Sequence, residues 1–153
     1  MSITSTSIQP CLWFDDNLEE AARFYTGIFP NSSMGHMTRL AGEFTLDGLA
    51  FRGINGGPDH AGFTEAVSFQ VTCRDQSEVD YYWDSLVDGG AESVCGWLKD
   101  RFGLSWQIVP VRLYELIHDP DRARAEAAVA AMMRMRRIVV AELERAADGA
   151  GHE

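Results

Sequence analysis

Two segments of this chain, 58 positions apart, carry the same pattern of helix caps and apolar residues. One runs from Asn17 to about Phe29 and the other from Asp75 to about Asp88, and each opens on a residue that can cap a helix. Two amphipathic helices would share part of this pattern by chance, but expected strands surround both in the same order, which predicts a duplicated βαβββ unit. The paired positions are Asn17 with Asp75, Ala21 with Val79, Phe24 with Tyr82, Tyr25 with Trp83, and Ile28-Phe29 with Leu86-Val87.

The first half contains a strong hairpin signal. Strands are expected at Ile8–Phe14 and Met34–Leu40. Two further strand patterns, Glu43–Leu46 and Leu49–Ile54, flank Asp47-Gly48, a dipeptide typical of a two-residue β-turn. This half therefore supplies one strand before its helix and three after it.

The second half repeats this order. Ala66–Cys73 alternates as a strand, and Gly89-Gly90 ends the following helix. The stretch Cys95–Pro110 holds a polar turn and then a strand with two distinct faces. One face carries Leu104, Trp106 and Ile108, and the other carries Ser105 and Gln107.

After Pro110 the pattern becomes helical. A short helix or turn is expected at Val111–Ile117, a helix from Asp119-Pro120 to about Met133, and a last helix over Ile138–Ala147. The expected class is α+β, in one domain with three parts. These are module one at about residues 8–57, module two at about 64–110, and a C-terminal helical extension at 111–148.

Length and charge limit the function classes. A chain of 153 residues with 46% hydrophobic content is large enough for one well-packed domain. Its net charge of −10 argues against binding nucleic acid or an anionic membrane. We find no membrane span or signal-peptide pattern and expect a cytoplasmic protein. Its three cysteines fit neither a disulfide framework nor a Cys-x-x-Cys zinc site, so reduced structural thiols are expected at Cys11, Cys73 and Cys95.

A series of short motifs is specific when taken together. They are Trp13-Phe14-Asp15, Glu20-Ala21-Ala22 with Phe24-Tyr25, Phe29-Pro30-Asn31-Ser32, Asn55-Gly56-Gly57-Pro58, Ser68-Phe69-Gln70-Val71, Asp80-Tyr81-Tyr82-Trp83 and the Cys95–Pro110 stretch. From Ile8 to Leu143 the chain resembles the glyoxalase/bleomycin-resistance (vicinal oxygen chelate) superfamily, in its 3-demethylubiquinone-9 3-methyltransferase-like or PhnB-like branch. The resemblance implies paired βαβββ modules, curved mixed sheets around a cup, and commonly a homodimer. It does not assign a reaction, because one fold carries many functions.

Metal-dependent members of this superfamily bind the ion through His, Glu or Gln on strands that face the cup. The resemblance places Pro10, Ser68 and Gln107 near three of these positions, and leaves the fourth, on the second strand of the hairpin, unassigned. Only Gln107 is a plausible ligand, so we expect no intact metal site and no cofactor. Three histidines elsewhere in the chain lack metal-like spacing, so we assign them surface or structural roles: His36, His60 and His118.

Strand alternation predicts a ligand-binding row. The polar face of the strand at 66–73 can hydrogen bond a small molecule inside the cup, although a solvated face or a dimer seam remains an open alternative. The opposite face, with Val67, Phe69 and Val71, is expected to pack against helices. The candidate ligand-binding residues are Ser68, Gln70 and Gln107, beside Thr72 and Ser105.

Arg52 is the fourth candidate ligand-binding residue. The hairpin places it opposite Glu43, so it can either hold an anionic substrate or form a cross-strand ion pair, and the ion pair is the preferred interpretation. Tryptophans can stack on an aromatic ligand, but strand parity assigns Trp13 and Trp106 to the core and leaves Trp97 open.

Three functions remain open. The first is a glyoxalase-superfamily enzyme that acts on an unidentified small molecule without the usual metal, and the second is a noncatalytic binding or sequestering protein. The third is a methyltransferase, as the family label suggests, but no Gly-rich strand-to-helix turn for S-adenosylmethionine is present. The connection at residues 38–43 is shorter than is usual in the superfamily, so substrate access or dimer contacts are expected to differ.

Overall fold

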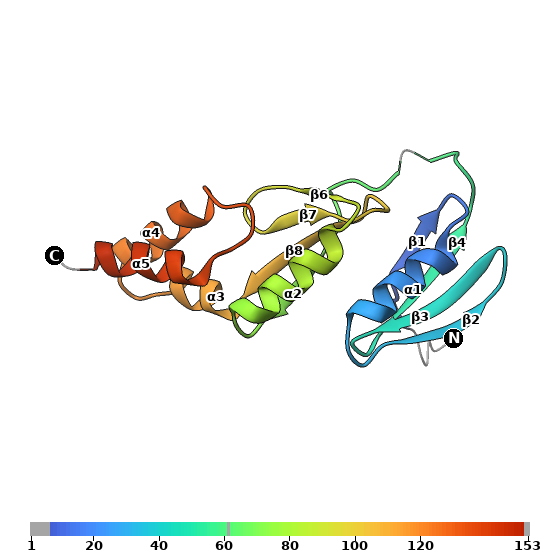
Figure 1. The fold of residues 1–153 in the computed structure, drawn as a ribbon, viewed down its shortest axis with the longest axis horizontal. Coiled ribbons are helices and arrows are strands. Elements are labelled where there is room, and N and C mark those ends of the chain that lie inside the picture. The colour runs from blue at the N-terminus through green and yellow to red at the C-terminus, as the bar shows by residue number, and fades with distance from the viewer. Residues whose placement is uncertain (1–6, 61, 152–153) are drawn as a thin grey trace, which may run out of the picture. The chain divides into compact units, whose positions relative to one another are not determined.

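The computed structural model of the protein describes residues 7–60 and 62–151. The chain forms two compact units, residues 1–62 and 63–153. Each unit contains one four-stranded mixed sheet with a helix against it, and three further helices belong to the second unit (Figure 1). The predicted α+β class and the two βαβββ modules are confirmed, and the cup that the resemblance implies stays a prediction.

The first unit consists of β1 (Cys11–Phe14), α1 (Leu18–Ile28), β2 (Ser33–Met37), β3 (Ala41–Leu46) and β4 (Leu49–Asn55). Its strand order is β1-β4-β3-β2, and β1 and β4 are the parallel pair. Asp47 and Gly48 form the β3–β4 turn with φ values of 46° and 81°, as a two-residue hairpin requires. The register places Glu43 opposite Arg52, as predicted.

Helix α1 packs against the first sheet through large apolar side chains. The Tyr25 ring lies 6.3 Å from that of Phe44, which stacks on Phe51 at 5.2 Å. Leu18 approaches the sheet at Gly53, where an added Cβ would lie 2.2 Å from the Leu18 side chain. Glycine at position 53 therefore allows the helix to pack this closely.

The second unit begins with β5 (Ser68–Cys73), α2 (Gln76–Val87), β6 (Ala91–Glu92), β7 (Trp97–Lys99) and β8 (Ser105–Pro110). Its strand order is β5-β8-β7-β6, with β5 and β8 parallel. Trp106 is buried as predicted, and its Nε1 donates to Oδ2 of the buried Asp100 at 2.9 Å. Oδ1 of Asp100 accepts from the backbone N–H groups of Phe102 and Leu104. The polar turn seen in the sequence is thus held by one satisfied buried carboxylate.

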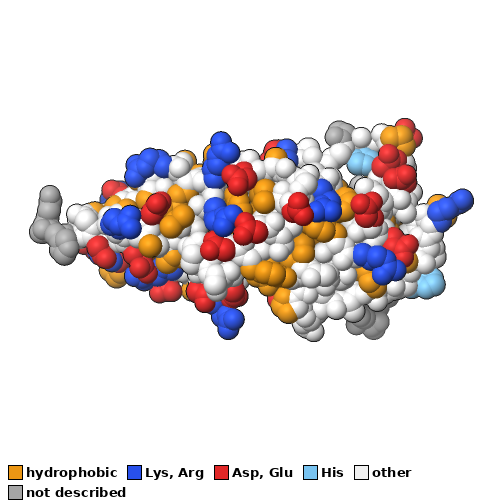
Figure 2. All heavy atoms as spheres, viewed as in Figure 1, with side chains coloured by type: hydrophobic (Ala, Val, Ile, Leu, Met, Phe, Trp, Pro, Cys, Tyr) orange, Lys and Arg blue, Asp and Glu red, His pale blue; other side chains and the backbone are white. Residues whose placement is uncertain are grey.

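The extension forms α3 (Val111–Ile117), α4 (Arg122–Met132) and α5 (Val140–Ala150). These helices share a core with the end of β8 that includes Val109, Leu116, Ile138 and Leu143. The side chain of Gln76 at the start of α2 joins them to the sheet, because it donates to Ile138 O at 3.0 Å and accepts from Val140 N at 2.8 Å. Acidic and basic side chains are interspersed over the surface seen in Figure 2.

The start of α4 was predicted two residues too early. Asp121 is its N-cap and accepts from Ala123 N at 3.0 Å. Asp119 instead accepts from Asp121 N at 2.8 Å and pairs with Arg124 at 3.0 Å, so it stabilises the turn before the helix. A short polar side chain followed by proline therefore marked a turn here and not the helix start.

The repeat holds at 58 positions for the helices, which begin at Leu18 and Gln76, but not for the strands. Three residues separate Phe14 from α1, whereas two separate Cys73 from α2, and Phe14 and Cys73 are the buried ends of β1 and β5. The strands therefore correspond at an offset of 59. This difference overturns two assignments that depended on the parity of the first strand.

Trp13 was assigned to the core and is 39% exposed. Leu12 and Phe14 occupy the buried positions of β1, which turns Trp13 to the opposite face. There its ring lies 5.1 Å from that of His60, and its Nε1 donates to Gly57 O at 3.0 Å. With an offset of 59, Pro10 corresponds to Phe69 and not to Ser68. Val67 was expected to pack against helices, but it is 62% exposed, so this expectation is wrong.

Candidate functional site

Three of the four predicted ligand residues lie in one hydrogen-bonded chain on the second sheet. Nε2 of Gln107 donates to Ser68 Oγ at 2.8 Å, and Nε2 of Gln70 donates to Gln107 Oε1 at 3.1 Å. Tyr114 of α3 completes the chain, because its hydroxyl donates to Gln70 Oε1 at 2.8 Å. Tyr114 was not predicted as a site residue, because only the fold brings this side chain of α3 to Gln70 on β5.

We call the face of the second sheet away from α2 the second outer face. Strand register arranges its side chains in two levels, because cross-strand partners share a face. At one level lie Gln70, Gln107 and Trp97, and at the other lie Ser68, Ser105 and Lys99. Ser105 is fully buried, and its Oγ has no hydrogen-bond partner among the residues described. Lys99 Nζ pairs with Glu65 Oε1 at 2.6 Å.

Several hydrogen-bond donors on the second outer face are not used by the bonds among its own side chains. Each of Gln70 and Gln107 keeps one N–H, and Ser68 keeps its hydroxyl hydrogen. Half-buried Trp97 adds an aromatic surface opposite Gln107. Such a set can bind carbonyl or ether oxygens on a planar ring.

Arg52 lies in the first unit, on the outer face of the first sheet, which is the face away from α1. Its guanidinium pairs with Glu43 at 2.9 Å and donates through Nε to Gln9 Oε1 at 3.0 Å. The preferred interpretation, a cross-strand ion pair, is therefore confirmed. Shallow hollows of about 220 Å³ and 280 Å³ flank this pair, and His36 and Cys11 line the smaller one.

The corrected strand offset matches one residue of the first sheet to Gln107, which the resemblance places near a metal position of the superfamily. Cys11 pairs with Arg52 as Gln70 pairs with Gln107, so Arg52 is the first-module equivalent of Gln107. A guanidinium is always protonated and cannot ligate a cation. Over residues 7–60 and 62–151, no three His, Cys, Asp or Glu side chains group as metal ligands. The donors present thus do not fit the metal site of the superfamily.

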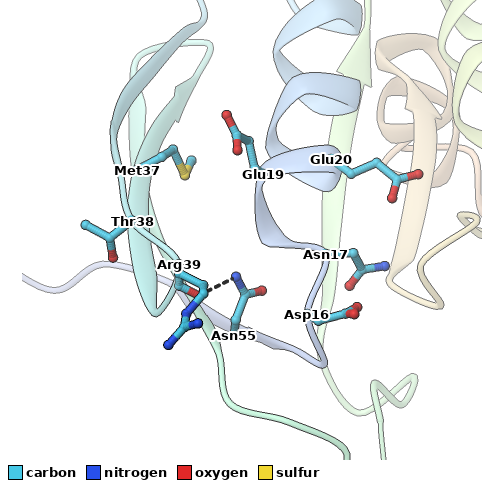
Figure 3. A pocket seen from close by; sticks show the side chains of 8 residues that line it. All are labelled: Asp16, Asn17, Glu19, Glu20, Met37, Thr38, Arg39 and Asn55. Carbon is cyan, nitrogen blue, oxygen red and sulfur yellow. Dashed lines mark hydrogen bonds between the residues drawn. The ribbon is translucent and has the colours of Figure 1, made fainter.

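A hollow of about 580 Å³ lies at the start of α1 (Figure 3). Asn17 occupies the N-cap position without a side-chain cap bond. The cap comes instead from Asn55, whose Oδ1 accepts from Leu18 N at 2.9 Å while its Nδ2 donates to Arg39 O at 3.0 Å. Asn55 thus fixes both the helix start and the short 38–43 connection, so we assign it a structural role.

Among the shifted pKa values in the second unit are those of Glu65, which is paired, and Cys73, which is buried. The hydrogen bond from Lys99 lowers the pKa of the Glu65 carboxyl below its ordinary value. Burial raises the pKa of the Cys73 thiol from 9.0 to about 12, with Glu78 and Asp75 adding to the rise. Of the three cysteines, all free, Cys73 alone is buried, while Cys11 is exposed and Cys95 is intermediate.

Comparison with known proteins identifies a matching family and a similar solved structure. A family model described as 3-demethylubiquinone-9 3-methyltransferase matches residues 6–109. A PhnB protein from Bacillus cereus that bears the same description is 31% identical, and the match covers 69% of this chain and 100% of that one, with a TM-score of 0.63. No curated protein matches the chain.

Two more distant structures show the fold alone. Protein PA1353 from Pseudomonas aeruginosa is 18% identical over 69% of this chain and 98% of its own, with a TM-score of 0.58. The fosfomycin resistance protein FosX from Listeria monocytogenes is 18% identical over 71% of this chain and 92% of its own, with a TM-score of 0.51.

The two βαβββ modules and these structural matches define a fold of the vicinal oxygen chelate superfamily. The chain belongs to the 3-demethylubiquinone-9 3-methyltransferase family within it. The family match ends at residue 109, so Tyr114 and helices α3–α5 lie beyond it. No helix within the described part of the chain is both long enough and apolar enough to cross a membrane.

Proposed function

We propose that this protein binds a small organic molecule with a planar ring and acceptor oxygens on the second outer face. The hydrogen-bonded chain of Ser68, Gln107, Gln70 and Tyr114 carries the proposal. Its internal bonds fix the orientation of both amides, and the remaining N–H and O–H groups are available to acceptor atoms of a ligand. Trp97 supplies the surface on which the ring stacks.

Binding without methyl transfer is the favoured form of this function. The family description names a methyltransferase of a demethylated quinone, and such a ring carries the acceptor oxygens that this face suits. However, the chain has no Gly-rich cradle for a methyl donor. Arg52 at a position that the superfamily uses for metal also speaks against the metal-dependent chemistry of that superfamily.

The working state that we propose is a cytoplasmic homodimer. Three free thiols support a reducing compartment, and the superfamily resemblance supports the dimer. Analytical ultracentrifugation tests the dimer, and a monomer at micromolar concentration would contradict it.

The test uses 2,3-dimethoxybenzamide, a neutral ring of the proposed class that does not alkylate thiols. We expect its addition to shift the side-chain amide NMR signals of Gln70 and Gln107. Gln107→Leu should weaken binding about tenfold, because it removes the central member of the chain. Thr72→Val is the matched control on the same strand and face, and it should bind as the wild type does.

Competing outcomes separate the other functions. Saturable binding of S-adenosylmethionine would favour methyl transfer, and manganese-dependent consumption of fosfomycin would favour an enzyme resembling FosX in activity. Unmoved Gln70 and Gln107 signals at millimolar benzamide would overturn the proposed site.

A further inference from the structure

Ser105 is an unusual residue on the second outer face. Its side chain is fully buried, and its Oγ has no hydrogen-bond partner among the described residues. A buried hydroxyl without a partner is costly, and each such group in a folded protein calls for a water, an ion or a ligand. Its neighbours in register are Ser68 on β5 and Lys99 on β7.

One residue at this level, Lys99, belongs to an ion pair. Strand β8 lies between β5 and β7, and Lys99 stands on β7 opposite Ser105. Its partner Glu65 lies in the turn three residues before Ser68, the first residue of β5. The bond from Lys99 to Glu65 therefore joins β7 to the segment that leads into β5, and the neighbours of Ser105 in register, Lys99 and Ser68, are close to its two ends in the chain.

The groups at this level are suited to an oxyanion. Ser68 Oγ already accepts from Gln107, so its hydrogen remains available as a donor. With the Ser105 hydroxyl and the Lys99 ammonium, the level offers three donors, one of them charged. Lys99 is the single lysine of a chain with net charge −10, and the carboxylate that it holds belongs to the chain itself.

We propose that Ser68, Ser105 and Lys99 form a carboxylate-binding subsite. In the free protein the Glu65 carboxylate pairs with Lys99, and a ligand carboxylate replaces it on binding. This proposal rests on the proposed function and narrows the ligand to an aromatic carboxylate. The ring and its oxygens lie at the level of Gln107 and Trp97, and the acid group lies at the level of Ser105. Exchange is easy because Glu65 is 61% exposed, outside any helix or strand, and exposed ion pairs are weak.

Two matched probes test the subsite: 2,3-dimethoxybenzoate and the neutral 2,3-dimethoxybenzamide, each titrated by calorimetry at pH 7. Wild-type protein should bind the benzoate about tenfold more tightly, as a charge-assisted hydrogen bond allows. Lys99→Met should remove this preference. Glu65→Gln should tighten benzoate binding several-fold and leave benzamide binding unchanged, because it weakens the internal competitor. Glu144→Gln is the control, because it breaks a comparable ion pair between Glu144 on α5 and Arg112 on α3.

Ser105→Ala separates a binding role from a structural one. We expect weaker benzoate binding with an unchanged or raised Tm, because the substitution removes a buried hydroxyl that has no partner within residues 7–60 and 62–151. A lowered Tm with unchanged benzoate binding would mean that a resident water satisfies Ser105, and would overturn the subsite. Equal affinity for both probes would also overturn it while leaving the proposed function intact. Failure of both probes to bind would overturn the two proposals together.

Discussion

The two sheets of this protein share a backbone plan and differ in the chemistry of their outer faces. Position for position, Cys11 and Arg52 of the first sheet correspond to Gln70 and Gln107 of the second. Arg52 is neutralised within its own sheet by Glu43. The second sheet keeps unused donors and one buried hydroxyl that has no partner among the described residues. A duplicated scaffold can thus leave one copy internally satisfied and the other ready for a ligand.

The largest expected losses of stability lie in the cores. Phe51 and Trp106 hold equivalent buried positions, one before Arg52 and one before Gln107. We expect Phe51→Ala to lower the unfolding free energy by about 4 kcal/mol. Trp106→Ala should lower the unfolding free energy by about 5 kcal/mol, because it also removes the hydrogen bond that Trp106 donates to buried Asp100. Denaturant unfolding with hydrogen exchange of each unit measures both, and a smaller loss for Trp106→Ala would contradict the role given to Asp100.

The helix caps provide a second comparison. Helix α2 is capped by its own Asp75, which accepts from Glu78 N at 3.0 Å, whereas α1 is capped from β4 by Asn55. Asn55→Ala should cost about 2 kcal/mol, because it loses the cap and the bond to Arg39 O, and Asp75→Ala about 1 kcal/mol. Thermal unfolding measures these losses. Asn17→Ala is the control and should be nearly neutral, so a loss as large as that of Asn55→Ala would show that Asn17 caps the helix.

The buried strand ends differ in their response to pH. Phe14 does not titrate, but the folded-state pKa of Cys73 is raised from 9.0 to about 12. Between these values the unfolded chain releases the thiol proton and the folded chain keeps it, so stability falls as pH rises above 9. At pH 10 the loss should be about 1.4 kcal/mol relative to pH 8. Unfolding under reducing conditions checks this, and Cys73→Ala should lack this part of the pH dependence.

The smallest effect is expected at the ion pair of the first sheet. Glu43→Gln breaks the pair with Arg52, whose side chain is 58% exposed. Water and salt screen such a pair, so the loss should stay below about 1 kcal/mol and shrink further at 1 M salt. A salt-independent loss above about 2 kcal/mol in denaturant unfolding would show that the stability of the first sheet depends on this ion pair.

Local patterns predicted the scaffold, and non-local contacts decided the rest. The Asp47-Gly48 turn, the cap at Asp75 and the buried Trp106 follow from short-range chemistry and were read correctly. Trp13 was misplaced because one extra residue between β1 and α1 changes the parity of the strand relative to the helix.

The candidate site was predicted in part for the same reason. Alternation placed Ser68, Gln70 and Gln107 on one face, and the hydrogen bonds among them agree with that placement. Tyr114 joins the row from a helix 44 residues beyond Gln70. Lys99 lies opposite Ser105 only because of the register of a three-residue strand. The periodicity of the sequence predicts neither the contact of Tyr114 with Gln70 nor the pairing of Lys99 with Ser105.

The bond that Gln76 makes to the extension sets an order of assembly. Its two partners, Ile138 and Val140, come 62 and 64 residues later in the chain. The first unit closes with much less chain, since Trp13 finds its partner at Gly57. During synthesis the first sheet can therefore fold as soon as it leaves the ribosome, while the side chain of Gln76 cannot complete its bonds until Val140, 64 residues later, has been made.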